Sequence, residues 1–356
     1  MNHELLTELR SLSAKALAIC KRWQRTCRAY FRTARGNVLV LALALGIFAI
    51  AGLHLTSAGN GTPATSPTAT VQQTTQTTTT PNPGPTQSNP FFAAHASWSQ
   101  DFTGKTAGSA DAGSWNVLVG PAENSNNEQQ YYTDSSTNIR IENGALRLIA
   151  TKQAEPSGYQ YGSARIETQG KQSFLYGRMD IVAKLPRGAG TWPAVWLLPA
   201  NDLYEQRSPA SDPLRYRNGG EIDILEAVGF QPNKIYGIAH TALDFTSRSD
   251  GTGSYNAIDV PTSTSAFNTY TLLWTPTSLT FEVNGTPYFT YARKANADYT
   301  SWPFDQPFYL IANLAMGGSW GGMDTAHFPG NGIDNSALPA SLDIRSIYYY
   351  PYIGSQ

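Results

Sequence analysis

Cysteine is almost absent from this sequence. Its 356 residues include only Cys20 and Cys27, and both lie in a basic segment at the N-terminus. The 320 residues that follow residue 36 have no thiol, so that part of the chain folds without disulfides and needs a hydrophobic core of sufficient size. No His/Cys/Asp cluster has the spacing of a zinc site. No phosphate-cradling loop is present either, which removes one common class of enzyme.

The chain also lacks a basic excess outside its first 36 residues. That head holds eight Lys/Arg and two acidic residues, a net charge of +6, whereas residues 37–356 hold 17 basic and 24 acidic residues, a net charge of −7. An acidic body argues against nucleic acid as a partner. A basic head beside an apolar run indicates a membrane instead.

Only one stretch is long, apolar and free of charge, as a membrane span would be. Val38 to Leu55 contains eighteen uncharged residues, with basic residues crowded on its N-terminal side. We expect a transmembrane signal anchor over 37–56, with the basic head (1–36) in the cytoplasm and the rest outside the cell membrane. The alternative is a signal peptide cleaved near Ala58, which would secrete the protein.

Residues 57–92 lack charge as well and are rich in Thr and Pro, with six threonines between Thr74 and Thr80. Such a composition cannot bury enough apolar surface to fold, so we expect a disordered linker. The sequence therefore predicts a head, an anchor, a linker and one folded domain at 93–356.

Within that domain, no long helical periodicity occurs. Short apolar alternations separated by turn signals predict an all-β fold of two antiparallel sheets packed face to face. The expected strands are Asn138–Ile141, Ala145–Thr151, Ser163–Gln169, Leu175–Lys184, Thr191–Leu198, Glu221–Ala227, Ile235–Thr241, Asn268–Thr275, Ser278–Val283, Thr286–Tyr291, Phe308–Ala315 and Ala340–Tyr350.

One expected strand carries three carboxyl groups, in the hexapeptide Glu221-Ile-Asp-Ile-Leu-Glu226. In a strand, Glu221 and Asp223 share a face and the Ile residues face the other way. A single-residue bulge after Asp223 would return Glu226 to the acidic face. Two carboxyl groups roughly 5 Å apart suit retaining glycoside hydrolysis. The alternative is an edge strand with its acidic residues facing water.

Several blocks of sequence in the predicted domain resemble glycoside hydrolase family 16, and specifically its laminarinase-like branch. They are NNEQQYYTD at Asn126–Asp134, Tyr161–Pro199 with its TWPAVWLLP, GGEIDILEAVG, Phe267–Gly285 and PFYLIANLAMGGSW at Pro307–Trp320. The resemblance spans about Trp98 to Tyr350. It implies a concanavalin A-like β-jelly-roll sandwich with a substrate cleft across its concave sheet.

The resemblance also implies roles for the acidic residues. Glu221 matches the nucleophile that forms a covalent glycosyl-enzyme, and Glu226 matches the general acid/base. Asp223 lies between them, and its charge would keep Glu226 protonated near neutral pH, because a like charge raises a carboxyl pKa.

Other positions match substrate-binding residues of the family, and each has a structural alternative. Trp192 and Trp196 are four residues apart on one face of a strand, for sugar stacking or for core packing. Trp320 lies in a Gly-rich loop at the expected rim. Asn127 and Arg165 match residues that hydrogen-bond sugar hydroxyls, although an Arg on a strand is often ion-paired. His240 ends the strand after the acidic one and either lines the cleft or is structural.

No cofactor is expected for catalysis. Family members often hold a structural Ca²⁺, and the matching positions are Asp343 through its side chain and Gly144 and Asp101 through backbone oxygens. Asp343 could equally cap a turn.

The function that we predict is retaining, endo-acting hydrolysis of β-1,3-glucan by a monomeric catalytic domain, with mixed-linkage β-1,3-1,4-glucan as a further substrate. Two alternatives remain open on the same fold. One is a β-glucan-binding module without turnover, and the other is a cell-wall transglycosylase.

Overall fold

The computed structural model describes residues 85–122, 126–209, 211–212, 217–247 and 253–354. The basic head, the expected anchor and most of the linker lie outside these residues, so the expectations for them stay predictions. Within the described part of the chain, no helix is both long and apolar enough to cross a membrane.

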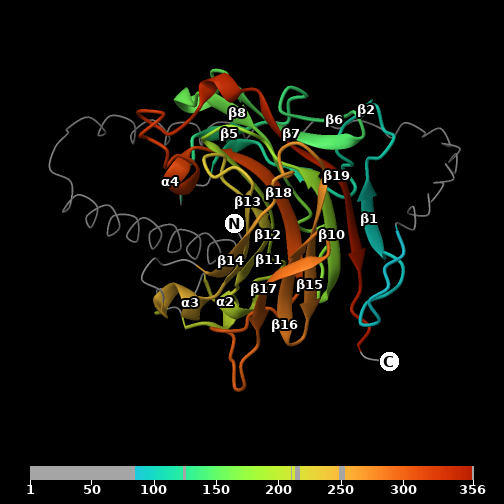
Figure 1. Cartoon of the computed structure of the whole chain (residues 1–356). Helices are drawn as coiled ribbons and strands as arrows, with labels where there is room; N and C mark the ends of the chain where they lie inside the picture. The colour runs from blue at the N-terminus through green and yellow to red at the C-terminus, as the bar shows by residue number, and fades with distance from the viewer. Residues whose placement is uncertain (1–84, 123–125, 210, 213–216, 248–252, 355–356) are drawn as a thin grey trace, which may run out of the picture. The chain divides into compact units, whose positions relative to one another are not determined.

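The described residues form an all-β domain with two sheets (Figure 1). The larger sheet has twelve strands, with the main order β17-β16-β15-β10-β19-β7-β8-β5-β4, and β1, β2 and β6 are added beside this path. These strands are β1 Trp98–Asp101, β2 Ala107–Gly108, β4 Gly120–Pro121, β5 Gln130–Tyr132, β6 Ile139–Glu142, β7 Ala145–Lys152, β8 Tyr161–Ser163, β10 Gly177–Lys184, β15 Asn268–Thr275, β16 Ser278–Val283, β17 Thr286–Ala292 and β19 Ala340–Tyr350.

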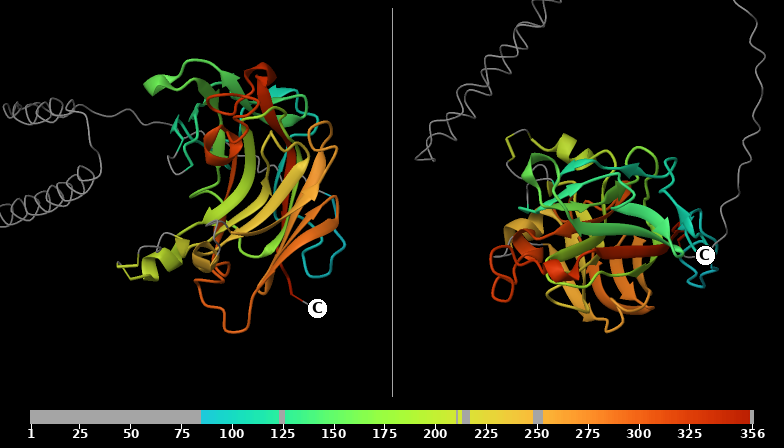
Figure 2. Two further views of the ribbon diagram at one scale, coloured as in Figure 1. Left: turned by 60° about the vertical axis from the view of Figure 1, so that its left-hand side comes forward. Right: turned by 90° about the horizontal axis from the view of Figure 1, so that it is seen from above.

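The second sheet has seven strands in the order β14-β13-β12-β11-β18-β9-β3. Its strands are β3 Asn116–Val117, β9 Arg165–Glu167, β11 Thr191–Pro199, β12 Glu221–Glu226, β13 Lys234–His240, β14 Ser254–Asp259 and β18 Phe308–Met316. Figure 2 shows the two sheets as stacked layers. Short helices occur in the connections: η1 Pro156–Gly158, α2 Leu203–Arg207, α3 Ala242–Ser247, α4 Gly318–Gly321 and η3 Asn335–Ala337.

The core lies between the layers, and the alternation of the strands explains it. In β16, every second residue is buried, as expected when one face packs on the core and the other meets solvent. In β18, all nine residues are buried, because this strand lies near the middle of its sheet and both of its faces are covered. The expected all-β class and the two antiparallel-rich sheets are thus present, and the ladder between β5 and β8 is parallel.

Residues 85–92, which their composition assigns to the linker, pack against the C-terminal strand of the domain. Phe92 is buried with Tyr348 and Tyr350, and the Tyr350 hydroxyl donates a hydrogen bond to the carbonyl of Pro85 at 2.7 Å. Gln87 is also buried, and its amide donates to the carbonyl of Phe92 at 2.7 Å. The folded part of the chain therefore includes residues upstream of 93.

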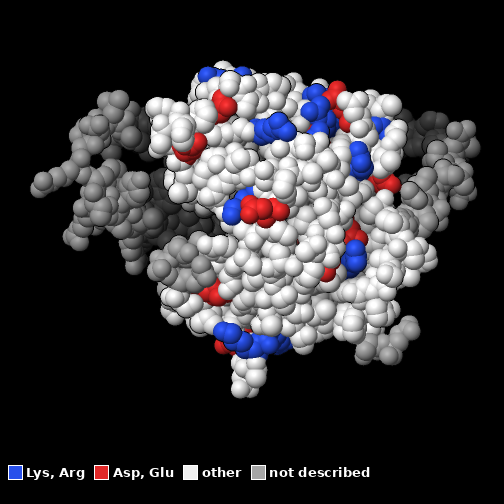
Figure 3. Space-filling view, viewed as in Figure 1, with Lys and Arg blue, Asp and Glu red and all other residues white. Residues whose placement is uncertain are grey.

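Charged side chains are sparse on the surface of the domain. On the face seen in Figure 3, the charged side chains form small clusters, several of which contain both signs, and no broad basic patch covers that face. This pattern agrees with the low charged content of the sequence, 14% of all residues. A neutral, hydroxyl-rich ligand would meet little long-range electrostatic field on this side.

Candidate active site

Strand β12 has the bulge that its sequence suggests. Along β11, Val195 pairs with Leu225 and Trp196 pairs with Asp223, so Ile224 is one extra residue on the β12 side. The extra residue shifts the phase of the strand by one. As a result Glu226 returns to the face of Asp223, while the intervening Ile224 and Leu225 are buried in the core.

The three carboxyl groups of β12 all line one cavity on the seven-stranded sheet. Arg165 from β9, two indoles from β11 and an amide from β18 complete its walls. The lining residues are Asn126, Glu128, Tyr132, Arg165, Trp192, Ala194, Trp196, Glu221, Asp223, Glu226, Asn313 and Ala315. Acidic, amide, hydroxyl and aromatic groups in one hollow are suited to a polar ligand with apolar faces, such as a sugar.

His240 stands beside the carboxyl groups, because β13 pairs it directly with Glu221. Its Nε2 lies 2.9 Å from Oδ2 of Asp223, which is almost fully buried. Burial by itself would lower the pKa of His240, but the charges of Glu221 and Asp223 outweigh burial and raise this pKa to about 9. An imidazolium beside Asp223 therefore balances part of the negative charge of the site near neutral pH.

Glu221 and Glu226 both hold their protons more strongly than free carboxyl groups do. Burial, followed by the charge of Asp223, raises the pKa of Glu221 to about 8. The same two causes raise the pKa of Glu226 well above its ordinary value, and Glu221 adds to the effect. Because the groups are coupled, the site carries fewer negative charges near neutrality than its three carboxyl groups suggest. A protonated glutamate at this pH is the state that general acid catalysis requires.

The two tryptophans of β11 both line the cavity, but their indole N–H groups have different partners. Trp192 is 8% exposed, and its Nε1 donates to Oε1 of Glu226 at 2.7 Å. Trp196 is half-buried, and its Nε1 donates to Oδ1 of Asn313 at 2.7 Å. The guanidinium of Arg165 lies 5.3 Å from the centre of the Trp196 ring.

Arg165 is buried in the wall of the cavity. Its Nη2 lies 3.4 Å from Oε2 of Glu167, so it has the ion pair that its position on a strand suggests. Its Nε has no hydrogen-bond partner among the described residues. A buried N–H without a partner is costly, so this atom is an exception among the buried donors of the domain.

Two residues that were expected to bind substrate, Asn127 and Trp320, do not line the cavity. Asn127 is exposed and has a positive φ of 55°, and its neighbours Asn126 and Glu128 line the cavity in its stead. Trp320 lies in α4 and does not line the cavity directly. Its ring packs edge-on against Trp192, with 5.6 Å between the ring centres.

The lining residues that were not expected from the sequence include three with polar side chains, Asn126, Tyr132 and Asn313. Asn313 accepts the bond from Trp196 and donates one to the Tyr132 hydroxyl at 3.2 Å. A signal for Asn313 was present, since it is the one polar residue in the apolar run of β18. Such an amide on a buried strand needs polar partners, and they are found where a site is built.

The one side chain expected to hold calcium, that of Asp343, is already ion-paired in this structure. Oδ1 of Asp343 accepts from Arg147 Nε at 3.0 Å, and its Oδ2 lies 3.1 Å from Lys184 Nζ. Two positive side chains therefore already neutralise the carboxylate that calcium would need. Asp101 and Gly144 lie at the end of β1 and in the turn after β6. Calcium binding stays a prediction from the resemblance, and this ion pairing argues against it.

Among the described residues, one group of acidic and histidine side chains is compact enough for a metal, namely Glu221, Asp223 and His240. These residues already pair with one another within the cavity. Their arrangement is explained by charge balance, and we assign no metal to it.

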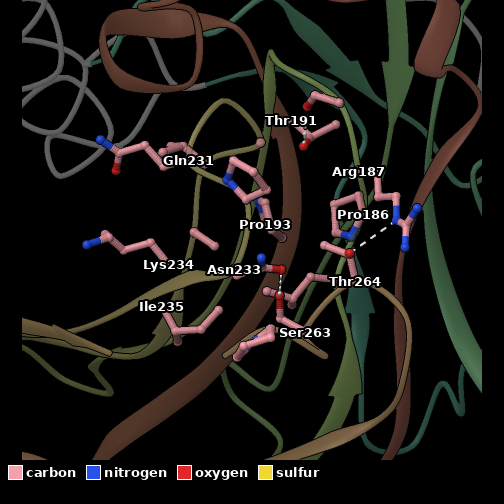
Figure 4. A pocket seen from close by; sticks show the side chains of 17 residues that line it. Pro186, Arg187, Thr191, Pro193, Gln231, Asn233, Lys234, Ile235, Ser263 and Thr264 are labelled. Carbon is pink, nitrogen blue, oxygen red and sulfur yellow. Dashed lines mark hydrogen bonds between the residues drawn. The ribbon is translucent and has the colours of Figure 1, made fainter. Parts of the chain in front are cut away.

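A second cavity, of about 420 Å³, lies away from the acidic groups (Figure 4). It is formed where three connections meet, those between β10 and β11, between β12 and β13, and between β14 and β15. Prolines, amides and hydroxyls line it, with Arg187 and Lys234 as its charged residues and no carboxyl group. This second cavity therefore offers no carboxyl group for acid/base chemistry.

Comparison with known proteins agrees with this geometry. The family model described as glycosyl hydrolases family 16 matches residues 126–330. A beta-glucanase of Rhodothermus marinus is 37% identical over 261 residues, which cover 72% of this chain and 85% of that protein. Glucan endo-1,3-beta-glucosidase A1 of Niallia circulans is 30% identical over 272 residues, which cover 71% of this chain but 37% of that longer protein.

The fold is also similar to that of a solved glycoside hydrolase structure. The X-ray structure of the laminarinase from Rhodothermus marinus matches with a TM-score of 0.65 and 36% identity, over 75% of this chain and all of that chain. The fold and the acidic cavity are those of a glycoside hydrolase. More specifically, the chain belongs to glycosyl hydrolases family 16, which confirms the resemblance seen in its sequence.

Proposed function

We propose that this glycoside hydrolase cleaves internal β-1,3 bonds of β-glucan with retention of configuration, and that mixed-linkage β-1,3-1,4-glucan is a further substrate. The observation that carries the proposal is the bulge of β12, which brings Glu221 and Glu226 to the same wall of one cavity. The two groups also interact, since the charge of Glu221 raises the pKa of Glu226. Retaining enzymes use two carboxyl groups that are close in this way.

In the first step, Glu221 attacks the anomeric carbon. The bond from that carbon to the glycosidic oxygen breaks, and Glu226 gives its proton to the departing oxygen. In the second step, a water molecule attacks the same carbon, Glu226 takes a proton from the water, and the bond to Glu221 breaks. Two inversions at one carbon give net retention.

Asp223 and His240 support these steps through their charges. The buried Asp223 keeps the proton on Glu226 before the reaction, because a second negative charge nearby is unfavourable. His240 pairs with Asp223 and limits that negative charge. When substrate occupies the cavity, this pairing lets one glutamate ionise as the nucleophile while the other keeps its proton.

The remaining lining residues are suited to hold a glucan chain. The indole of Trp196 offers a flat apolar face to the C–H groups of a sugar ring. Arg165 lines the cavity, and its guanidinium group is a hydrogen-bond donor suited to a sugar hydroxyl. The cavity keeps both carboxyl groups of a hydrolase, so the interpretation as a binding module without turnover is not favoured.

The test compares laminarin hydrolysis by the wild-type chain, Glu221→Ala and Glu226→Gln in a reducing-sugar assay. We expect both variants to lose at least about 10³-fold in kcat, since each removes a group required in both steps. Glu282→Gln, on β16 of the other sheet, serves as the control and should keep full activity. Turnover that survives either active-site substitution would refute the proposed roles.

A further inference from the structure

The hydrogen bond between Trp192 and Glu226 has a direct chemical consequence. Glu226 is paired with Ala194 across the ladder, so Trp192, two residues along β11, occupies the diagonal position that a large aromatic side chain can reach. Its Nε1 lies 2.7 Å from Oε1 of Glu226. An indole N–H is a donor only and cannot reverse its role. Oε1 therefore accepts this bond in both protonation states of the glutamate.

The indole is held firmly enough to fix the carboxyl group. Trp192 is 8% exposed and packs with the buried Val228 and Ala315. Trp320 meets its ring edge-on, and Tyr236 in turn meets Trp320, with ring centres 4.9 Å apart. Three aromatic side chains from β11, β13 and α4 thus form a support behind the hydrogen bond.

We propose that Trp192 is a positioning residue that assigns the transferable proton of Glu226 to one oxygen and assists its ionisation. The inference rests on the proposed function and adds a role for this side chain beyond sugar contact. Because Oε1 accepts the indole N–H, the acidic proton of Glu226 resides on Oε2. In the first step this proton passes from Oε2 to the glycosidic oxygen, and in the second step the proton of water returns to Oε2.

The charged groups around Glu226 determine how strongly the indole N–H affects the ionisation of this glutamate. Asp223 and Glu221 on its own strand raise its pKa, whereas His240 across the ladder and the indole N–H lower it. The Tyr236 hydroxyl is the other titratable group that senses the charge of Glu226 from β13. Without the indole N–H, the carboxyl group would be a weaker acid and would lose its fixed rotamer.

Trp196 offers a matched control on the same face of the same strand. Its indole also donates at 2.7 Å, but to the neutral amide of Asn313 and not to a catalytic carboxyl group. Replacing each indole by phenylalanine therefore removes an aromatic N–H in both cases. Only Trp192→Phe removes a hydrogen bond to the acid/base.

The experiment measures kcat, KM and the pH profile of kcat/KM for wild type, Trp192→Phe and Trp196→Phe. Two substrates are used, a laminari-oligosaccharide and an aryl β-laminaribioside whose dinitrophenolate leaves without protonation. For Trp192→Phe we expect about a 10-fold fall in kcat on the oligosaccharide. On the same oligosaccharide, the basic limb of kcat/KM should move to higher pH. On the aryl glycoside, we expect less than about a 3-fold fall in the pre-steady-state burst rate.

For Trp196→Phe, any fall should be similar on the two substrates and the basic limb should not move. An equal loss on both substrates by Trp192→Phe, with an unmoved limb, would overturn the proposal and leave the indole a packing residue. If Trp192→Phe does not fold, 3-benzothienylalanine placed at position 192 keeps the ring shape and lacks only the N–H, and the same outcomes apply. A wild-type chain that cleaves neither substrate would refute the proposed function itself.

Discussion

Asp223 and His240 face each other on neighbouring strands, with 2.9 Å between Oδ2 and Nε2. Asp223 lies in the middle of the acidic strand, and the carboxyl groups on either side of it belong to the two proposed catalytic residues. Its charge raises the pKa of both of them and of His240. One buried residue therefore couples the protonation of the whole site.

Asp223→Asn should change the pH dependence of the reaction as well as its rate. Removing this charge lowers the pKa of Glu226, so the acid form is lost earlier and the basic limb of kcat/KM moves to lower pH. We expect about a 10-fold loss of activity at neutral pH. Kinetics on laminarin between pH 4 and 10 measure both effects. Asp259→Asn, exposed on β14, is the control, and an unmoved basic limb in Asp223→Asn would contradict the coupling.

Glu221→Gln should stabilise the domain as pH rises. The pKa of Glu221 in the folded state, about 8, lies above its ordinary value of 4.5. The carboxyl group therefore contributes stability that is complete below about pH 4.5 and is lost as pH rises toward 8. The melting temperature of the variant, relative to wild type, should increase between pH 5 and 8, by roughly 2–4 °C for each kcal/mol.

The control for this measurement is Glu142→Gln. Hydrogen bonds from Arg147 and Arg140 lower the pKa of Glu142, so the contribution of this group is already complete above pH 5. The difference in melting temperature between Glu142→Gln and wild type should stay constant between pH 5 and 8. A flat difference for Glu221→Gln as well would show that its carboxyl group ionises normally in the folded protein.

Gly229→Ala should destabilise the domain through a backbone contact three residues after Glu226. A Cβ at this position would lie 1.8 Å from the carbonyl oxygen of Gly188 and 2.4 Å from Oγ1 of Thr191. Relief of such a clash requires the chain to shift, at a cost of about 1–3 kcal/mol. Thermal unfolding should show a fall of several degrees. Gly113→Ala meets only the side chain of Asp111, and it should melt within about 1 °C of wild type.

Calcium should leave the stability of the domain unchanged, because Arg147 and Lys184 already bind the carboxylate of Asp343. A bound ion at 100 times its Kd would add about 2.7 kcal/mol. That amount would raise the melting temperature by roughly 5–11 °C. Melting curves in EDTA and in millimolar CaCl₂ test this expectation. A rise of that size would contradict this expectation and support the calcium site that the family resemblance implies.

The sequence predicts the acidic strand well, because its pattern is local. The alternation of acidic and apolar residues from Glu221 predicts a strand. Glu226 is out of phase with Glu221 and Asp223 by one residue, which predicts a bulge between Asp223 and Glu226. The structure has both features. Most long strands were likewise expected from period-two alternation, whereas two-residue strands such as β2 and β3 offer too few residues for any period to appear.

Contacts that depend on pairing between strands could not be read from the sequence. The bond from Trp192 to Glu226 exists because β11 and β12 pair in one particular register, which no local pattern records. The same applies to Asp343, whose partners Arg147 and Lys184 come from two different strands. At Asn126 and Asn127, a positive φ at the second residue decides which side chain lines the cavity.

The anomeric configuration of the first product tests the central claim most directly. Proton NMR during the first minutes of laminari-oligosaccharide cleavage, before mutarotation, reports which anomer the enzyme releases. If Glu221 and Glu226 act as a nucleophile and an acid/base on one wall of the cavity, the β-anomer appears first and the α-anomer grows in later. Initial release of the α-anomer would show single displacement by water and would contradict the account.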